Sequence, residues 1–254
     1  MPIHREKPMN LLVATILLRP YVFAFLLVFL LAGRADLGWR RTLLFGAWAW
    51  PLAWLAEFAS TRVGVPFGLY HYTGATVGQE LYIANVPFMD SLSFTFLAYA
   101  AFCLARVTLA GRSVSRPTLA IVSGLLMMLL DVVIDPLAVR GDRWFLGRIF
   151  YYPEGGAYFG VPLTNFLGWW IVGAVSVGAW LWSGPATPPR GRPWPGVGLY
   201  YGVLAFNLAV TAWIGEWKLA ATGLVIHVML ALTAVASARA ASWPASMLGE
   251  VSGR

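Results

Sequence analysis

Long apolar stretches recur along the whole chain. They cover residues 11–32, 42–60, 86–110, 117–138, 162–183, 197–214 and 219–240. A helix of about 20 mostly apolar residues is long enough to cross a lipid bilayer. Charged residues make up only 11% of the 254-residue chain, whereas about a quarter of the residues in soluble domains are charged. The sequence therefore predicts the all-α class: a polytopic transmembrane helical bundle of about seven spans, in a single integral membrane domain over residues 1–254.

The N-terminal segment combines a basic start with an apolar run, a combination that also occurs in signal peptides. Arg19-Pro20 interrupts the run and no clear small-residue cleavage site follows, so residues 11–32 are interpreted as the first helix. Arg19 either reaches toward the membrane surface or marks a kink beside Pro20. The single cysteine, Cys103, offers neither an internal disulfide nor a metal cluster and is interpreted as a small buried apolar residue.

The formal net charge is +7. In a membrane protein such an excess is typical of basic loops on the cytoplasmic side, and no basic stripe interleaved with aromatic residues indicates nucleic-acid binding. With seven helices, ten basic residues fall on the side of the C-terminus and seven on the other, which favours a cytoplasmic C-terminus.

The acidic residues are distributed less evenly. Nine of the eleven fall on the side opposite the C-terminus: Glu6, Glu57, Glu80, Asp90, Asp131, Asp135, Asp142, Glu154 and Glu216. Because acidic residues contribute little to orientation, this asymmetry predicts a polar site near one leaflet.

A weak internal repeat relates two parts of the chain. The segment "VPFMD" at 86–90 matches "VPLTN" at 161–165, 75 residues later, and each opens an apolar helix. Pro suits the first turn of a helix, and Asp or Asn there interacts well with the helix dipole. The sequence predicts two related helical hairpins in parallel orientation, each contributing acidic and aromatic residues to one cleft, as ligand sites often lie between such repeats.

Two carboxylates close the fourth predicted helix. Asp131 and Asp135 are four residues apart, which places them on the same helix face just before Pro136. A charge at membrane depth costs several kcal/mol and is usually functional or paired. Asp135 could also be an ordinary acid at the membrane surface, but Asp131 lies one turn deeper. In apolar surroundings, beside a second acid, a carboxyl group is expected to keep its proton at neutral pH, as a general acid does.

Further polar candidates lie at the neighbouring helix ends. Glu57 ends the second predicted helix, while Asp90 and Asn165 open the helices at 86–110 and 162–183. Each could also be an ordinary helix-end residue at the membrane interface.

Aromatic residues are concentrated in the connection that follows the aspartate pair. Ten of the 27 residues from 144 to 170 are aromatic: Trp144, Phe145, Phe150, Tyr151, Tyr152, Tyr158, Phe159, Phe166, Trp169 and Trp170. One interpretation is an interfacial aromatic belt. The other is a pocket for an apolar ligand with a cationic intermediate, since an aromatic face stabilises a nearby cation by up to about 2 kcal/mol. Tyr70, His71 and Tyr72 in the earlier loop could join this pocket.

The sequence indicates no metal or cofactor site. The histidines lack metal-ligand spacing: His4, His71 and His227. The aspartate pair with Arg140 and Arg143 is similar to magnesium–diphosphate motifs, but no second Asp-rich helix completes such a site. Glu216 is expected to pair locally with Lys218. A proton-coupled transporter stays open as an alternative, but it would need a polar path across both leaflets.

Three segments together resemble a known family. They are "EFASTRVGVPFGLYHYTG" (57–74), "DVVIDP" (131–136) with Trp144 after it, and "GGAYFGVPLTNFLGWW" (155–170). In order and spacing, over residues 45–180, the chain resembles the membrane-bound carotenoid 1,2-hydratases of bacteria and haloarchaea, which look distantly related to the small membrane lycopene cyclases.

The resemblance implies an activity and a set of site residues. It implies cofactor-free addition of water to the terminal 1,2 double bond of an acyclic carotenoid, within the bilayer of a prokaryotic cell membrane. The residues on motif positions are Glu57, Tyr70, Tyr72, Asp131, Asp135, Trp144, Tyr158, Asn165 and Trp169; Asp90 and Glu216 have no clear counterpart. On this basis we expect Asp131 to donate the proton with Asp135 as its partner. Lycopene cyclisation stays open as an alternative reaction, as does a homo-oligomeric state.

Further roles are expected for the aromatic residues and for Glu57. Aromatic faces such as Tyr158, Trp144 and Trp169 are expected to hold the cation, with Phe159 and His71 contributing to the substrate pocket. Glu57 or Asp135, together with Asn165, is expected to position the attacking water and remove its proton.

Overall fold

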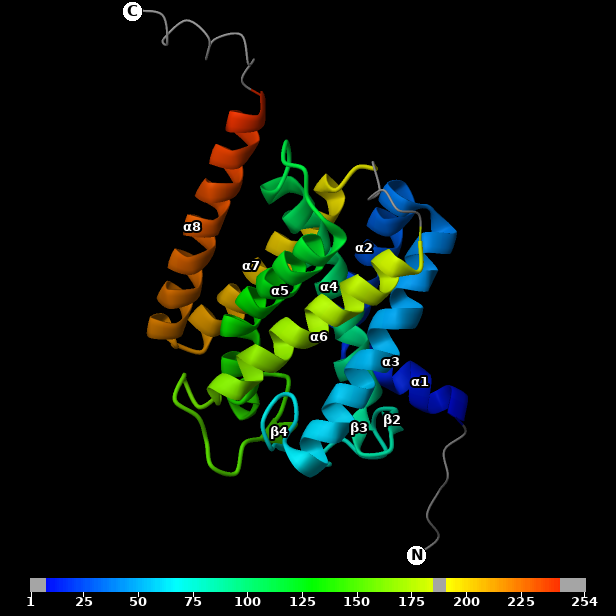
Figure 1. The fold of residues 1–254 in the computed structure, drawn as a ribbon. Helices are drawn as coiled ribbons and strands as arrows, with labels where there is room; N and C mark the ends of the chain where they lie inside the picture. Colours follow the sequence, from blue (N-terminus) through cyan, green and yellow to red (C-terminus); the bar gives the residue numbers. More distant parts are fainter. Residues whose placement is uncertain (1–7, 185–190, 243–254) are drawn as a thin grey trace, which may run out of the picture.

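The fold is a bundle of α-helices with short strands in its connections. The computed structural model describes residues 8–184 and 191–242 of the chain. Its helices are α1 (Pro8–Leu18), α2 (Pro20–Leu37), α3 (Trp39–Val63), α4 (Phe88–Thr108), α5 (Arg116–Ala138), α6 (Leu163–Trp182), α7 (Trp194–Trp213) and α8 (Trp217–Ser242). The strands are β1 (His71–Tyr72), β2 (Tyr82–Ile83), β3 (Val86–Pro87) and β4 (Phe150–Tyr151), and a 3₁₀ turn covers Gly141–Arg143. The long helices run between two ends of the molecule (Figure 1), and the predicted all-α class is confirmed.

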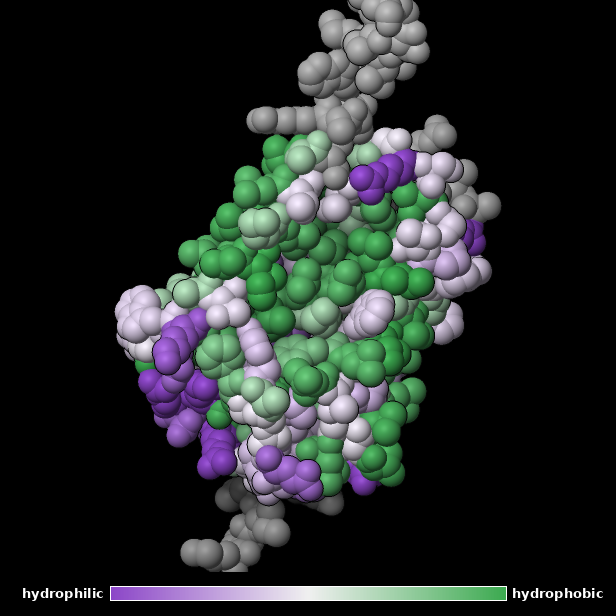
Figure 2. All heavy atoms as spheres, turned by 60° about the vertical axis from the view of Figure 1, so that its left-hand side comes forward, coloured by the Kyte–Doolittle hydropathy of each residue, from purple (hydrophilic) through white to green (hydrophobic). Residues whose placement is uncertain are grey.

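Several of these helices can cross a membrane. Five of them, α2, α4, α5, α6 and α7, are long and apolar enough to do so, and α8 contains a shorter apolar part, Trp217–Thr233. Figure 2 shows a broad apolar surface across the middle of the molecule, with hydrophilic residues gathered toward its ends. The chain is an integral membrane protein. Of the seven predicted spans, the one at 42–60 is not confirmed, because α3 is not apolar enough over a span's length, and the one at 219–240 is confirmed only as a shorter apolar segment.

The acidic residues gather where the sequence predicts. The α3–α4, α5–α6 and α7–α8 connections lie at one end of the bundle (Figure 1), and these connections and the helix ends beside them hold eight of the nine acidic residues assigned to that side. The ninth, Glu6, lies outside the described residues, as does the C-terminal segment on which the predicted orientation depends.

The first predicted helix, 11–32, is wrong as a single element. It is two helices, because the chain breaks at Arg19, whose φ of −125° and ψ of 49° are not helical, and Pro20 starts α2. Arg19 does not reach toward the membrane surface: its side chain is fully buried and forms an ion pair with Glu80 at 3.0 Å. It also donates a hydrogen bond to the carbonyl oxygen of Leu146 at 2.7 Å. The break therefore ties the start of α2 to both long loops.

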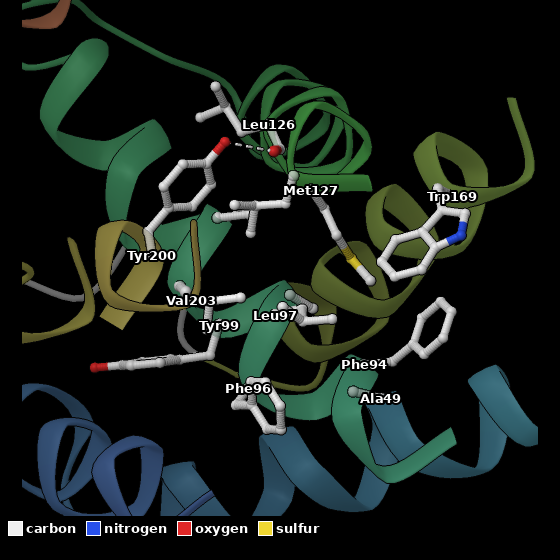
Figure 3. Packing of buried hydrophobic residues seen from close by; sticks show 14 of the residues in the cluster. Ala49, Phe94, Phe96, Leu97, Tyr99, Leu126, Met127, Trp169, Tyr200 and Val203 are labelled. Carbon is white, nitrogen blue, oxygen red and sulfur yellow. Dashed lines mark hydrogen bonds between the residues drawn. The ribbon is translucent and has the colours of Figure 1, made fainter. Parts of the chain in front are cut away.

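Helix α4 is the centre of the bundle. It packs against α2, α3, α5, α6, α7 and α8, and most of its side chains from Phe94 to Ala105 are buried. Figure 3 shows the labelled α4 residues pointing from this helix toward different neighbours, with Phe94 opposite Trp169 of α6. Cys103 is buried here, as the sequence predicts.

The helices of the two predicted hairpins begin and end at positions that differ by the same number of residues, and the two loops contact each other. Helices α4 and α6 begin at residues 88 and 163, and α3 and α5 end at 63 and 138, so both pairs of bounds are 75 residues apart. Their loops meet in an antiparallel pair of strands, in which His71 of β1 lies opposite Tyr151 of β4 and Tyr72 lies opposite Phe150. This pairing brings the loops together over the same end of the bundle.

Helices α5 and α6 pack closely at two glycines. A Cβ atom on Gly124 would clash with the carbonyl oxygen of Trp170 and lie 2.9 Å from the Cβ atom of Ala174. On the facing helix, a Cβ atom on Gly173 would lie 3.0 Å from the Cα atom of Gly124. Small residues of this kind let helix backbones approach each other in membranes.

We expect Gly124→Ala to destabilise the protein by about 1–3 kcal/mol, the usual cost of overpacking a close contact. The measurement is the free energy of unfolding in detergent micelles. Gly202→Ala on α7 is the matched control, because a Cβ atom there meets nothing within 4 Å. Equal stability of the two variants would show that the α5–α6 contact tolerates a wider spacing.

Candidate active site

A cavity of about 120 Å³ lies at the end of the bundle where the long loops meet. Its wall takes side chains from α2 to α7 and from both loops. Eight of the residues with a predicted role in the site line it: Glu57, Tyr70, Tyr72, Asp90, Asp135, Trp144, Asn165 and Trp169. The cavity therefore combines acidic groups with aromatic rings, as the sequence predicts.

The aspartate pair forms one hydrogen-bonded unit with α6. The amide nitrogen of Asn165 donates to Asp131 Oδ2 at 2.6 Å and to Asp135 Oδ2 at 2.8 Å. The indole N–H of Trp169 also donates to Asp135 Oδ2, at 3.1 Å, and the backbone N–H of Asp135 donates to Asp131 Oδ1. The helical spacing of four residues explains why the two carboxyl groups are neighbours.

The two aspartates differ in their access to the cavity. Asp135 lines the wall, whereas Asp131 is completely buried and lies outside the set of wall residues. Among the described residues, the ion pairs involve other groups: Arg19 with Glu80, Arg106 with Asp36, and two arginines with Glu216. The aspartate pair thus has amide and indole donors but, in this part of the chain, no cationic partner.

A second acidic group faces the cavity from the other hairpin. Glu57 is 4% exposed, and its Oε2 atom has no hydrogen-bond partner among the described residues. Buried polar atoms are normally satisfied by protein or water, so this oxygen is available to a water molecule. The Tyr72 hydroxyl lies within reach of both Glu57 and Asp90. Burial, and then the charges of Asp90 and Glu57, raise the pKa of Tyr72, so it stays a neutral hydrogen-bond donor.

Four predicted site residues lie off the cavity wall. They are Asp131, which is described above, and His71, Tyr158 and Phe159. Successive side chains of a strand point to opposite faces, so His71 points away while Tyr72 lines the cavity, and the His71 ring packs on Tyr151. Tyr158 packs edge-on against Phe159 and Phe166, with centroid distances of 4.9 and 5.3 Å. The expectation that Tyr158 and Phe159 face the substrate therefore finds no support in their placement.

Several wall residues were not predicted. Most of them are aromatic, namely Tyr21, Phe25, Phe67, Phe94 and Phe206, whereas the wall residues Phe150 and Tyr152 belong to the predicted aromatic cluster at 144–170. The Phe94 ring stacks on the Trp169 indole with a centroid distance of 4.4 Å (Figure 3). Sequence reasoning offered no signal for Phe94 or Phe206, because an aromatic residue in an apolar helix usually belongs to the core.

The basic residues after the aspartate pair are engaged elsewhere. Arg140 contacts Glu216 at 3.1 Å, and Arg143 also pairs with Glu216. Local pairing of Glu216 with Lys218 was therefore a wrong expectation. Burial by itself would raise the pKa of Glu216, but the hydrogen bonds and charges of the two arginines together lower it. Within residues 8–184 and 191–242, no group of three or more His, Cys, Asp or Glu side chains could hold a metal ion; His4 lies outside these ranges.

The sequence profile of one family, described as "carotenoid biosynthesis protein", matches residues 9–230. The chain belongs to the carotenoid biosynthesis protein family. The match extends beyond the resemblance expected over residues 45–180, and it includes α2, α7 and most of α1.

A relative that matches part of the chain is named as a hydratase. Bisanhydrobacterioruberin hydratase from Haloarcula japonica is 32% identical over 121 residues, which cover 48% of this chain and 38% of the relative. No solved structure matches the chain significantly. Family membership identifies the chain as a protein of carotenoid biosynthesis that is similar to a hydratase.

Proposed function

We propose that the protein is a carotenoid 1,2-hydratase, which adds water to the terminal double bond of an acyclic, lycopene-like or γ-carotene-like end group and gives a tertiary alcohol. The observation that carries the proposal is a pair of neighbouring carboxyl groups, one completely buried and the other half-buried and lining a cavity walled by aromatic rings. The named relative supports it, since it is called a hydratase of a carotenoid.

Asp135 is the proton donor in this proposal. Two adjacent carboxyl groups in an apolar site share a proton, because both cannot ionise together without a compensating charge. Asp135 transfers its proton to C2 of the alkene, and the positive charge develops at C1. Asp131 is a positioning residue, because it contacts Asp135 and Asn165 from behind the cavity wall.

The cation at C1 is stabilised by aromatic faces. Trp169 is held in place by its hydrogen bond to Asp135 and by its stacking on Phe94. An aromatic face near a desolvated cation contributes up to about 2 kcal/mol. Because this charge exists only near the transition state, the interaction accelerates the reaction rather than merely binding the substrate.

Glu57 completes the reaction as the base. Its unpartnered Oε2 atom accepts a hydrogen bond from water, which attacks C1 and gives its proton to Glu57. The water supplies the oxygen and one hydrogen, and Asp135 supplies the hydrogen at C2. Returning the proton from Glu57 to Asp135 through solvent restores the site, so the net reaction consumes one water and needs no cofactor.

The cavity fits an end group rather than a whole carotenoid. A cavity of about 150 Å³ holds one benzene molecule, so a cavity of about 120 Å³ accommodates roughly one terminal isoprene unit. Small volume and a few polar groups on an aromatic wall suit a reaction at one end of a long apolar molecule.

The test is co-expression with a lycopene-producing pathway in a heterologous host, followed by chromatography and mass spectrometry of the pigments. We expect a new pigment that is heavier than lycopene by one water, or by two if both ends react. A product of unchanged mass would indicate cyclisation and overturn the hydratase proposal. Unaltered lycopene, with the protein present in the membrane, would also overturn it for this substrate.

A further inference from the structure

The cavity has a second, aromatic side formed by α2 and α7. Tyr21 and Phe25 of α2 and Phe206 of α7 all line the wall. The Tyr21 and Phe206 rings stack with a centroid distance of 5.1 Å and an interplanar angle of 19°. Phe25 meets Phe206 edge-on at 5.8 Å. At this boundary the two helices are therefore joined by ring contacts across the cavity wall.

The ring contacts continue from the cavity wall to the outer surface. Phe145, which is 54% exposed, packs on Tyr21 at 5.7 Å and on Trp144 at 4.9 Å. It also reaches Phe206 at 6.3 Å. Because Tyr21, Trp144 and Phe206 line the cavity, one layer of aromatic side chains separates the cavity from the outside here.

The helices outside this layer are apolar. Both α2 and α7 are long and apolar enough to span a membrane, and α2 exposes large apolar residues such as Leu27 and Leu31. The opposite side of the cavity is different: Phe67 and Trp169 are almost fully buried there. The loop side is covered by the paired strands, beneath which Tyr70 and Tyr152 are buried.

We infer that the boundary between α2 and α7 is the lateral opening through which the apolar chain of the substrate extends into the bilayer. This inference rests on the proposed function. A cavity that holds about one isoprene unit leaves the rest of a long acyclic polyene outside it. Tyr21, Phe25 and Phe206 form the gate: their side chains rotate to admit the polyene, and their faces then pack along it.

The test closes the gate covalently and measures binding. In a Cys103→Ala background, Phe25→Cys and Phe206→Cys are combined, and the protein is reconstituted in phosphatidylcholine vesicles containing lycopene. A short bifunctional methanethiosulfonate reagent cross-links α2 to α7 through mixed disulfides, which do not require the Cβ spacing of a direct disulfide, and a reductant releases them in the same sample. We expect at least a tenfold loss of lycopene that co-purifies with the cross-linked protein, and recovery after reduction. Unchanged binding after complete cross-linking would overturn the inference.

Two single variants provide an independent test that needs no cross-link. Phe25→Ala is expected to accelerate lycopene uptake several-fold, because it removes part of the gate. Phe23→Ala is the matched control, since Phe23 is a similarly half-buried ring on α2 that does not line the cavity. Equal uptake rates for the two variants would contradict the gate.

Binding and turnover separate this inference from the proposed function. If the cross-link reduces lycopene binding but lycopene is never hydrated, the lateral opening is supported and the proposed hydratase activity is refuted. If the fully cross-linked protein still hydrates lycopene, the lateral opening is refuted and the proposed hydratase activity is supported.

Discussion

Asp135→Asn is expected to lower the rate of hydration by about 10²- to 10⁴-fold, the contribution that a general acid typically makes. Asparagine has nearly the same shape and can still interact with Asn165 and Trp169, but it cannot give a proton to the alkene. The fold should therefore persist while the water-adduct pigment disappears. The measurement is the yield of hydrated pigment per amount of membrane-inserted protein.

Asp142→Asn is the matched control, because Asp142 is an exposed acid in the same connection. It should hydrate at the wild-type rate. Full activity of Asp135→Asn would refute Asp135 as the donor and return that role to Asp131, as the sequence predicted.

Asp131→Asn distinguishes positioning from proton donation. Its carboxyl group lies behind Asp135 and off the cavity wall, so the variant should retain more activity than Asp135→Asn. Because the substrate meets Asp135 and not Asp131, the loss should fall on kcat and leave the affinity for lycopene unchanged. A general structural defect would weaken both.

The sequence could predict that Asp131 and Asp135 share a helix face, but not which of them meets the substrate. The spacing of four residues fixes their relation to each other. The rotation of α5 relative to its neighbours decides which one lines the cavity, and that rotation depends on tertiary packing such as the contact between Gly124 and α6. Polar residues at apolar helix ends thus indicated which side chains gather at one cavity, but not the role of each.

Two local features limited the prediction further. A two-residue strand has no sequence periodicity, so nothing indicated that Tyr72 points inward while His71 points outward. Phe25 and Phe206 lie in apolar helices, where a ring that packs in the core and a ring that lines a cavity look the same in sequence. The Arg19-Pro20 interruption was visible, but the partner of Arg19, Glu80, is 61 residues away in the chain.

Arg19→Leu is expected to destabilise the protein by about 3–5 kcal/mol, the cost of removing one partner from a buried ion pair. Both side chains are fully buried, so the variant leaves the Glu80 carboxylate without its partner. It also removes the donor to the Leu146 carbonyl oxygen. The measurement is the free energy of unfolding in detergent micelles. Arg143→Leu is the matched control: its ion pair is 46% exposed on the arginine side, and such pairs contribute about 0–1 kcal/mol.

The double variant Arg19→Leu/Glu80→Leu distinguishes two causes of the lost stability, the unpaired Glu80 carboxylate and the missing hydrogen bond to Leu146. Replacing both members of a buried pair by apolar residues is often neutral or stabilising, so the double variant should recover much of the lost stability. A double variant as unstable as Arg19→Leu would show that the loss comes from the contact with Leu146 instead. Arg19 directly precedes α2, and Tyr21 lies two residues further on, at the cavity wall. A double variant that is stable but binds lycopene weakly would therefore mean that the ion pair positions the start of α2 for the substrate.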